Sequence, residues 1–499
     1  MIVAATGPAA LAQQQGSSPN GRMECASVTK LQLPDVRITA ATVYQPGQSI
    51  KVTHCQVDGV VGREIRFRLL LPDQWNQRFV MGGGGGFAGG VDNQAVGTIN
   101  AGYATVGTDT GHQGLPFSAL WALNDVERQI NYGHLGVHRV AEVAKAIIAR
   151  YYSTPATRSY FLGCSNGGRQ AMMEAQRYPD DFDGIVAGAP ALDFVAIGAQ
   201  FVRDARVLYP DPQRLAEPPF SADQLKLIEN SVVAACDAND GVKDGLIDDP
   251  RACRFDVSSV PACAASNAAN CLSDAQKSSL KQIYAPTTNA AGEIYVGQPV
   301  GGESEAEGWR AWVTGPNDLV YRFAKAPSLR FAFGTEFFKY FVFNEPSWDY
   351  TKYDFSTFQK DTKLAATFLN ATNPALDAFK AKGGKAIMWH GWSDPALTAL
   401  GSIKYYEQVT ARDANLRDYF RMFMLPGVLH CAGGPGPDRV DWATVISDWV
   451  EKGTAPDSVI ASKIVEGKTV RTRPLCPYPQ RAVYKGSGSI DEAANFACR

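Results

Sequence analysis

The sequence lacks long apolar runs, a strong charge of either sign and metal-type cysteine spacing. Its 499 residues carry a net charge of −2, so the charge balance gives no reason to expect nucleic acid or an anionic membrane as a partner. No stretch of 18 or more apolar residues is present that could cross a bilayer. None of the ten cysteines forms a C-x-x-C pair or a zinc-site spacing, which argues against a redox or zinc-binding role.

What is present is an ordinary globular composition, with 45% hydrophobic residues. The length exceeds that of one typical domain, so we expect one large core with an insertion. An even number of cysteines is compatible with five disulfides, without fixing which pairs form. Disulfides favour an oxidising compartment, so we expect a secreted or periplasmic protein. The oligomeric state is not predicted.

The N-terminus is small and apolar, and Ala-Leu-Ala at 10–12 resembles the end of a signal-peptide cleavage site. A basic segment before it is missing, so the alternative is an Ala/Gln-rich tail. Either way, residues 1–22 are left out of the fold prediction.

Short apolar strands alternate with helices along most of the chain. Strands are expected at 65–71, 78–81, 103–106, 160–162, 185–187, 386–389 and 419–425, and helices at 132–151, 166–178, 400–412 and 440–452. This alternation predicts an α/β fold with a parallel sheet covered on both faces. It fails between residues 205 and 372, which predicts a lid domain inserted into a catalytic domain of residues 23–204 and 373–499.

The run Gly-Cys-Ser-Asn-Gly at 163–167 lies between an expected strand and an expected helix. A G-x-S-x-G run in that setting is typical of a nucleophile elbow, in which a sharp turn exposes the serine. We therefore predict that Ser165 is a nucleophile, with a glycine-rich turn and an incidental serine as the alternative.

A serine nucleophile needs a base and an orienting carboxylate, which follow in the order Ser, Asp or Glu, His in this type of fold. Only His390 and His430 follow Ser165. His430 lies in a Gly/Pro-rich loop after the last long strand, and Asp394 follows the strand before it. We predict the triad Ser165, Asp394 and His430, and interpret His390 as structural. A plain turn at Asp394 and a structural role for His430 are the alternatives.

Cysteines flank the two predicted catalytic side chains, because Cys164 precedes Ser165 and Cys431 follows His430. A disulfide between these cysteines would bring their Cα atoms to about 4.4–6.8 Å. It would hold nucleophile and base side by side. We therefore predict a Cys164–Cys431 disulfide.

Two backbone N–H groups are expected to bind the oxyanion. One belongs to Asn166, directly after the nucleophile. The other comes from the glycine run 82–86 after an early strand, and we place it at or near Gly85. This run lacks the G-K-[ST] end of a phosphate loop. A flexible linker is the alternative.

An acidic loop in the insertion brings Asp237, Asp240 and Asp244 close in sequence. Folded back on itself, it could offer these carboxylates and the carbonyls of Val242 and Leu246 to one cation, a donor set that suits calcium. The EF-hand ligands at loop positions 3 and 12 are missing. A solvated turn is the alternative.

With these residues placed, the sequence resembles the tannase and feruloyl esterase family over roughly residues 25–498. The most specific match is the Cys-Ser, Asp and His-Cys set at 164–165, 394 and 430–431, supported by Gly-Gly-Gly-Gly-Phe at 83–87 and His-Gly-Trp-Ser-Asp at 390–394. The resemblance implies an α/β-hydrolase core with a lid. It also implies a structural Ca²⁺ held in the lid by Asp237, Asp240, Val242, Asp244 and Leu246. It suggests the further disulfides Cys25–Cys55, Cys236–Cys253, Cys263–Cys271 and Cys476–Cys498.

The resemblance further implies that the substrates are small esters of aromatic acids: ferulates, gallates or, in one branch, mono(2-hydroxyethyl) terephthalate. Tentative substrate contacts are Phe337, Phe338 and Leu397. The aromatic run 331–343 is equally compatible with stacking on the acyl group and with lid core. Arg322 and Arg330 lie in the region where the terephthalate branch needs a cation, whereas Leu397 replaces an aromatic residue of that branch.

We therefore predict a secreted serine esterase that hydrolyses hydroxycinnamic or gallic esters through an acyl-enzyme. The alternatives are a hydrolase of terephthalate monoesters and a non-catalytic binding protein on a hydrolase scaffold.

Overall fold

The computed structural model describes residues 21–264 and 269–499, so nearly all of the predicted signal-peptide remnant lies outside the described residues. One nine-stranded sheet in the order β1-β2-β3-β5-β4-β6-β7-β10-β11 forms the centre of the fold. Its strands are β1 (Val36–Tyr44), β2 (His54–Val61), β3 (Ile65–Pro72), β4 (Arg78–Gly82), β5 (Ala104–Thr108), β6 (Arg158–Cys164), β7 (Gly184–Gly188), β10 (Lys385–Gly391) and β11 (Phe420–Leu425).

Six neighbouring strands, from β5 to β11 in the sheet order, are parallel. This confirms the predicted parallel sheet for the part that carries the site. The strands β1, β2 and β3 extend the sheet as antiparallel neighbours. The first two were not predicted. The edge strand β1 is largely exposed and therefore lacks the apolar pattern of a buried strand.

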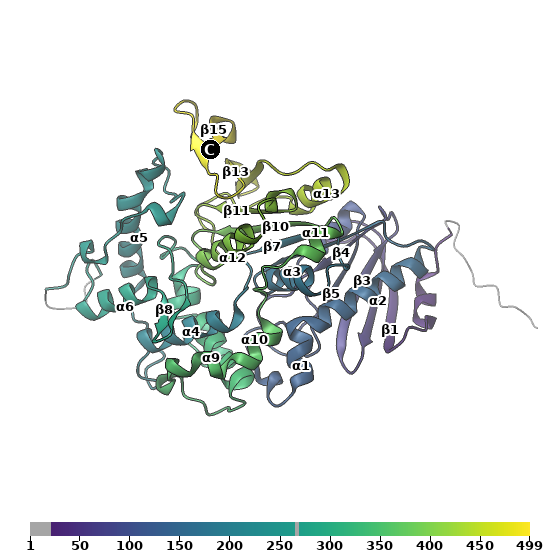
Figure 1. Ribbon diagram of the computed structural model, residues 1–499, viewed down its shortest axis with the longest axis horizontal. Coiled ribbons are helices and arrows are strands. Elements are labelled where there is room, and N and C mark those ends of the chain that lie inside the picture. Colours follow the sequence, from purple (N-terminus) through teal and green to yellow (C-terminus); the bar gives the residue numbers. More distant parts are fainter. Residues whose placement is uncertain (1–20, 265–268) are drawn as a thin grey trace, which may run out of the picture.

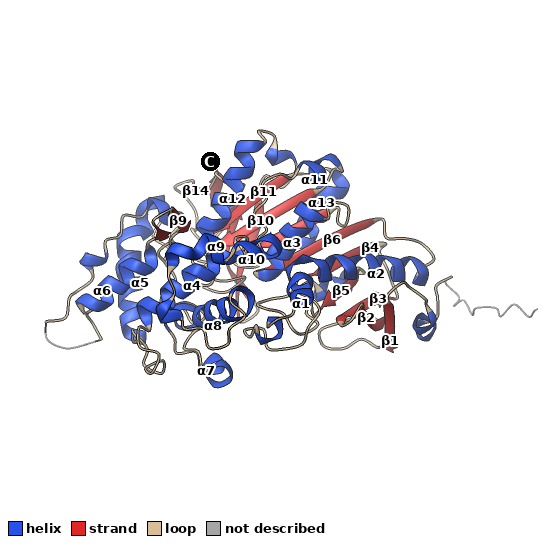
Figure 2. Ribbon diagram, turned by 60° about the horizontal axis from the view of Figure 1, so that its bottom comes forward, coloured by secondary structure: helices blue, strands red, loops and turns tan. Residues whose placement is uncertain are grey.

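Helices cover both faces of the sheet (Figure 2). The helices α2 (Gly136–Tyr151), α3 (Asn166–Arg177) and α12 (Ala399–Arg412) pack on one face, and α13 (Trp442–Lys452) packs on the other. Side chains of β10 point alternately to the two faces of the sheet. Met388 packs in the core under α2, α3 and α12, and Ile387 packs in the core under α13.

The described residues between β7 and β10 add no strand to this sheet. They contain α4 (Phe194–Leu208), α5 (Ala222–Cys236), α6 (Asp274–Tyr284), β8 (Thr287–Asn289), β9 (Gly292–Tyr295), α7 (Asp318–Ala324), α8 (Leu329–Phe337), α9 (Phe358–Asp361), α10 (Lys363–Leu369) and α11 (Asp377–Ala381). The helices α4, α5, α6 and α9 lie to one side of the sheet (Figure 1). The helix α4 packs against α8 across the predicted boundary at residue 205. The division at 205 and 372 therefore stays a prediction.

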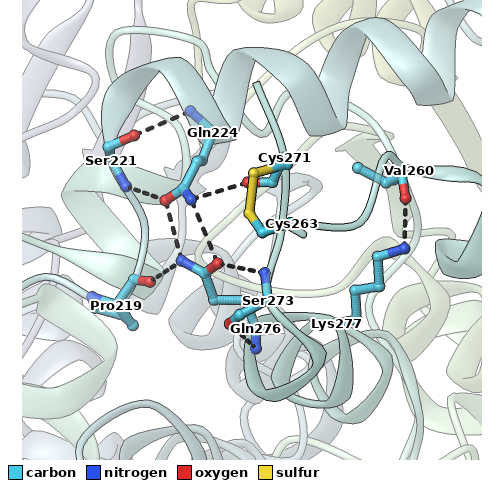
Figure 3. Close-up of a disulfide and its surroundings, with 9 residues drawn as sticks. All are labelled: Pro219, Ser221, Gln224, Val260, Cys263, Cys271, Ser273, Gln276 and Lys277. Carbon is cyan, nitrogen blue, oxygen red and sulfur yellow. Dashed lines mark hydrogen bonds between the residues drawn. A yellow bond between two sulfur atoms is a disulfide. The ribbon is translucent and has the colours of Figure 1, made fainter. Parts of the chain in front are cut away.

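Two helices of this segment begin with the same cap and are joined through it (Figure 3). Ser221 caps α5 together with Gln224, and Ser273 caps α6 together with Gln276. The two glutamine side chains also hydrogen-bond to each other, at 3.0 and 3.3 Å. With the nearby Cys263–Cys271 disulfide, this pair fixes the two helix starts beside one another.

All five predicted disulfides are formed. They are Cys25–Cys55, Cys164–Cys431, Cys236–Cys253, Cys263–Cys271 and Cys476–Cys498. The C-terminal region holds two antiparallel strand pairs, β12 (Val459–Val465) with β13 (Lys468–Leu475) and β14 (Ala482–Tyr484) with β15 (Phe496–Cys498). The Cys476–Cys498 disulfide joins the end of β15 to the residue that follows β13. Among the described helices, none combines the length and the apolar character that a membrane crossing needs.

Candidate active site

Ser165 occupies the sharp turn between β6 and α3. Its backbone has φ 65° and ψ −126°, a conformation that a non-glycine residue rarely adopts. Its N–H donates to the Gly188 carbonyl at 3.0 Å, which anchors the turn to β7. A Cβ atom on Gly163 would lie 2.5 Å from the backbone of Gly167, so the turn requires glycine there. This geometry is that of a nucleophile elbow.

Asp394 and His430 meet beyond the carboxyl ends of β10 and β11. The Nδ1 atom of His430 lies 2.8 Å from Oδ2 of Asp394. The other carboxylate oxygen accepts the backbone N–H groups of Ala396 and Leu397, at 2.8 and 2.9 Å. Asp394 is fully buried, and its orientation is set by these backbone bonds. His430 is therefore held by a carboxylate that cannot easily rotate.

A second histidine shares this carboxylate. The Nε2 atom of His390 lies 3.2 Å from Oδ2 of Asp394 and 3.0 Å from the Leu397 carbonyl. Because both neighbours only accept, this nitrogen carries the proton. Burial acts to raise the pKa of Asp394, but the charges and hydrogen bonds of His430 and His390 outweigh it, so the pKa lies below its ordinary value. The carboxylate thus stays ionised, and His390 supports it from inside the fold.

The Cys164–Cys431 disulfide joins the Ser165 turn to the loop that carries His430. Its two Cα atoms are 5.9 Å apart, although the cysteines are 267 positions apart in sequence. Ser165 and His430 are the direct neighbours of these cysteines, and both line the same cavity. The disulfide therefore limits how far the two side chains can separate.

The glycine run after β4 lies beside the Ser165 turn, but its N–H groups are used differently from the prediction. Gly85 donates its N–H to Oδ2 of Asp92 at 3.0 Å and does not line the cavity. Gly86 does line the cavity, and its N–H meets no acceptor among residues 21–264 and 269–499. Asn166, the first residue of α3, likewise has an N–H with no intrahelical acceptor. The structure thus favours Gly86 over Gly85 as the second donor, and the role of Asn166 stays a prediction.

The cavity next to Ser165 is largely apolar, and six of its fifteen lining residues are phenylalanine or tryptophan. It is lined by Gly86, Phe87, Ser165, Asn166, Ala191, Phe194, Ile197, Gly198, Phe201, Trp312, Phe333, Phe337, Ala396, Leu397 and His430. Among these described residues, none is a lysine, arginine, aspartate or glutamate. Trp312 lies edge-on to the His430 ring, with ring centroids 4.9 Å apart. The cavity therefore fits an uncharged aromatic group.

The aromatic run of the lid divides between cavity and core. Of the tentative contacts, Phe337 and Leu397 line the cavity. Phe338 does not, because it is fully buried against Trp348 and Tyr353. The prediction for Phe338 is wrong.

Several lining residues were missed from the sequence, among them Phe87, Phe194 and Trp312. They come from three separate segments, and no local spacing connects them. Phe194 was the easiest of these to find from the sequence, because it is the first residue of the helix that follows β7. The strand ends of such a sheet are where ligands bind.

Neither arginine considered for a terephthalate carboxylate reaches the cavity. Arg330 is buried, and its guanidinium forms an ion pair with Asp204 at 2.7 Å and a hydrogen bond with Gln298 at 2.5 Å. Gln298 in turn donates to the Asp394 carbonyl at 2.8 Å. Arg322 is exposed on α7. Arg330 therefore supports the triad loop and does not face the substrate.

The acidic loop is folded back on itself beside the Cys236–Cys253 disulfide. Asp237, Asp240 and Asp244 each accept backbone N–H groups of the loop, and Asp244 also pairs with Arg473. The three carboxylates do not all converge within 4.8 Å of one another. The carbonyls of Val242 and Leu246 accept no hydrogen bond from the described residues. Carbonyl oxygens that accept no hydrogen bond and lie next to carboxylates are ligands of the kind that calcium prefers.

Comparison with known proteins matches the chain to one family. The family model described as tannase and feruloyl esterase matches residues 50–499. The mono(2-hydroxyethyl) terephthalate hydrolase of Piscinibacter sakaiensis is 35% identical, covering 89% of this chain and 84% of its own. A probable feruloyl esterase of Arthroderma benhamiae is 34% identical, covering 86% and 81%.

A solved structure has the same fold. The crystal structure of feruloyl esterase B from Aspergillus oryzae superposes with a TM-score of 0.84 at 25% identity, covering 95% of this chain and 99% of that one. This likeness confirms the predicted α/β fold. The alternative of a non-catalytic binding protein loses its support, since it required an incomplete triad. The chain belongs to the tannase and feruloyl esterase family and is a carboxylic ester hydrolase.

Proposed function

We propose that the protein hydrolyses esters of uncharged aromatic acids, of the hydroxycinnamic type, through an acyl-enzyme on Ser165. His430 removes the Ser165 proton as the hydroxyl attacks the ester carbonyl, and then protonates the leaving alcohol. The N–H groups of Asn166 and Gly86 bind the oxyanion. Asp394 keeps the His430 ring in the required tautomer. Water then releases the acid by the same steps.

The observation that carries this proposal is the apolar lining of the acyl cavity. Trp312, Phe333 and Phe337 offer ring faces and edges to a flat acyl group. A galloyl ring has three hydroxyls, and burying them without partners would cost free energy. A feruloyl ring has a single hydroxyl and a methoxy group. The lining therefore favours ferulate over gallate.

Hydrolysis of terephthalate monoesters is the second candidate, supported by the 35% identity to an enzyme named for that substrate. A free carboxylate buried in this cavity would have no cationic partner, and an unpaired buried charge costs several kcal/mol. Arg330 is already paired with Asp204. We therefore rank this candidate below the hydroxycinnamic esters.

The test is kcat/KM for methyl ferulate, methyl gallate and mono(2-hydroxyethyl) terephthalate, each divided by the value for p-nitrophenyl acetate. We expect ferulate to lead, and the terephthalate monoester to be slower by about 100-fold or more, the size of an unpaired buried charge. Equal or faster turnover of the terephthalate monoester would reverse the ranking. If the protein hydrolyses none of the four esters, the proposal is refuted.

Removing the disulfide with the double variant Cys164→Ala/Cys431→Ala is expected to lower kcat by about 100-fold, because a 1 Å misplacement of reacting groups costs about that much. The two cysteines are 267 residues apart in sequence, so the free energy of unfolding should also fall by about 5.6 kcal/mol in the chain-entropy model. Steady-state assays with p-nitrophenyl acetate measure kcat, and urea unfolding measures the free energy of unfolding.

The matched control is Cys476→Ala/Cys498→Ala, which removes a disulfide with a separation of 22 residues. It should cost about 3 kcal/mol of stability and leave kcat unchanged. Similar kcat values for the two double variants would mean that the first disulfide does not serve the site.

We further propose that the acidic loop binds one structural Ca²⁺ through Asp237, Asp240 and Asp244 and the carbonyls of Val242 and Leu246. The ion would hold the lid loop and take no part in the chemistry. The melting temperature with calcium should exceed that in excess EGTA by about 3 °C, from about 2.7 kcal/mol at a hundredfold excess over Kd. Asp240→Asn should lose most of this difference. Equal melting and no bound calcium by elemental analysis would contradict the proposal.

We also propose that the protein works in a secreted or periplasmic setting. Its five disulfides, one of them next to the nucleophile, are stable under oxidising conditions and not in a reducing cytosol. Active protein should therefore be recovered from a periplasmic expression and lost from a reducing cytoplasmic one.

A further inference from the structure

One buried hydroxyl contacts both halves of the proposed oxyanion hole. The Tyr132 Oη atom lies 3.0 Å from the Gly86 carbonyl and 3.1 Å from Oδ1 of Asn166. Tyr132 belongs to the π-helical turn Asn131–Leu135 that leads into α2, and it is fully buried. It does not line the cavity, so it cannot touch the substrate. Any effect of its hydroxyl on catalysis must pass through Gly86 and Asn166, the two residues that the hydroxyl contacts.

The orientation of the Asn166 amide is determined by its other partners. Its Oδ1 accepts from Nε and Nη2 of Arg169 at 2.9 and 2.7 Å, and its Nδ2 donates to the Gly84 carbonyl at 3.0 Å. Both atoms facing the Tyr132 hydroxyl are therefore acceptors, and the single O–H proton is shared between them. The hydroxyl thus ties the glycine loop to the start of α3.

Arg169 is an unusual member of this network because its charge has no counterion. It is fully buried on α3, and among the described residues no carboxylate forms an ion pair with it. Besides Asn166, its guanidinium donates to the carbonyls of Tyr132, Gly133 and Leu369, at 3.1, 2.7 and 3.2 Å. It also lies 5.0 Å from the centre of the Tyr132 ring. A buried charge without a counterion is costly, so its position calls for an explanation.

The oxyanion of the tetrahedral intermediate would be the missing negative charge. Its proposed donors belong to Gly86 and Asn166, and both residues are bonded to the Tyr132 hydroxyl. A fixed positive charge next to developing negative charge stabilises it strongly in a site that excludes water. Arg169 is three residues after Asn166 on the same helix and needs no rearrangement to act in this way.

We propose that Tyr132 and Arg169 are positioning residues, which hold the Gly86 and Asn166 N–H groups at a fixed separation and keep a positive charge behind them. This inference rests on the proposed function, because it assumes that these N–H groups receive the oxyanion of Ser165 chemistry. It predicts a contribution made in the transition state and absent from ground-state binding, so kcat should change and KM should not.

The main test is Tyr132→Phe, which removes one oxygen atom and keeps the ring. We expect kcat for p-nitrophenyl acetate to fall by about 10- to 100-fold with little change in KM, less than the loss from deleting a direct oxyanion donor. Phenylboronic acid, which forms a tetrahedral adduct with an active serine, should bind more weakly by a similar factor. Ferulic acid, a product with a planar carboxylate, should bind as before.

The matched control is Tyr405→Phe on α12. Tyr405 is also buried, and its hydroxyl also joins two groups, Gln176 and Asn373, at 2.9 and 3.0 Å. This variant should lose comparable stability and keep both kcat and boronate affinity. If kcat falls equally in the two tyrosine variants, the loss comes from reduced stability and not from the oxyanion donors, and the inference is overturned.

Arg169→Lys and Arg169→Met separate charge from geometry. Lysine keeps the charge but not the planar fork, so it should retain more kcat than methionine, and both should fall below wild type. If neither folds, Tyr132→Phe decides alone. Unchanged kcat and boronate affinity in Tyr132→Phe would refute the inference, while an inactive Ser165→Ala would still uphold the proposed function. An active Ser165→Ala would refute both.

Discussion

Replacing Ser165 by alanine is expected to lower kcat for p-nitrophenyl acetate by about 10⁶-fold, the loss found when the nucleophile of a serine hydrolase is deleted. The cavity offers no substitute, because no other hydroxyl, thiol or amine side chain occurs among its described lining residues. Direct attack by water, helped by the remaining donors, would then be the only route. Single-turnover and steady-state assays with purified protein measure the loss.

The control for this prediction is Ser159→Ala in the same strand, β6. The Ser159 side chain is almost buried, and the hydrogen bond to Asp183 is made by its backbone, which the substitution leaves in place. This variant should keep wild-type kcat. A Ser165→Ala protein with activity within 100-fold of wild type, free of contaminating esterase, would show that Ser165 is not the nucleophile.

The parts of the site that could be predicted are those with local rules. The turn at Ser165 needs glycine at both ends and a strand and helix on either side, and each of these is visible in the sequence. The Cys164–Cys431 pair was predictable for a different reason. Two cysteines next to two predicted catalytic residues had a shared purpose, which distinguished this pairing from the many that ten cysteines allow.

The parts that could not be predicted depend on contacts between distant segments. Gly85 and Gly86 are equivalent in sequence, and the structure separates them only because Asp92 accepts the Gly85 N–H. Arg330 resembles a substrate-binding cation until Asp204 is seen to pair with it. In both cases a carboxylate elsewhere in the chain decides the role of the residue, and no spacing rule gives its position.

The role of Phe338 depends on what its ring packs against. Phe337 packs against Gly198 of α4 and lines the cavity, whereas Phe338 packs against Trp348 and Tyr353. Helical spacing does not separate the two, since Ile197 and Gly198 are also consecutive in a helix and both line the cavity.

Asp394→Asn is expected to lower kcat by about 10⁴-fold, the loss caused by forcing a catalytic histidine into the wrong tautomer. The backbone N–H groups of Ala396 and Leu397 require an oxygen at the Oδ1 position. The new NH₂ group must therefore replace Oδ2 and face His430. The Nδ1 atom of His430 can then only accept a hydrogen bond, so the ring proton moves to Nε2. Nε2 is the atom that must take the proton of Ser165, and a protonated Nε2 cannot do so.

His390 makes this outcome more severe. Its Nε2–H also points at Oδ2 of Asp394, so the asparagine NH₂ would face a second donor inside the fold. We therefore expect Asp394→Asn to lose stability as well as kcat, since a buried group without a partner costs about 1–3 kcal/mol. The variant Asp394→Asn/His390→Gln provides an acceptor for the new NH₂ group. It should regain stability in urea unfolding but not kcat, because the His430 tautomer stays wrong. Recovery of kcat together with stability would mean that Asp394 acts through folding alone and not on His430.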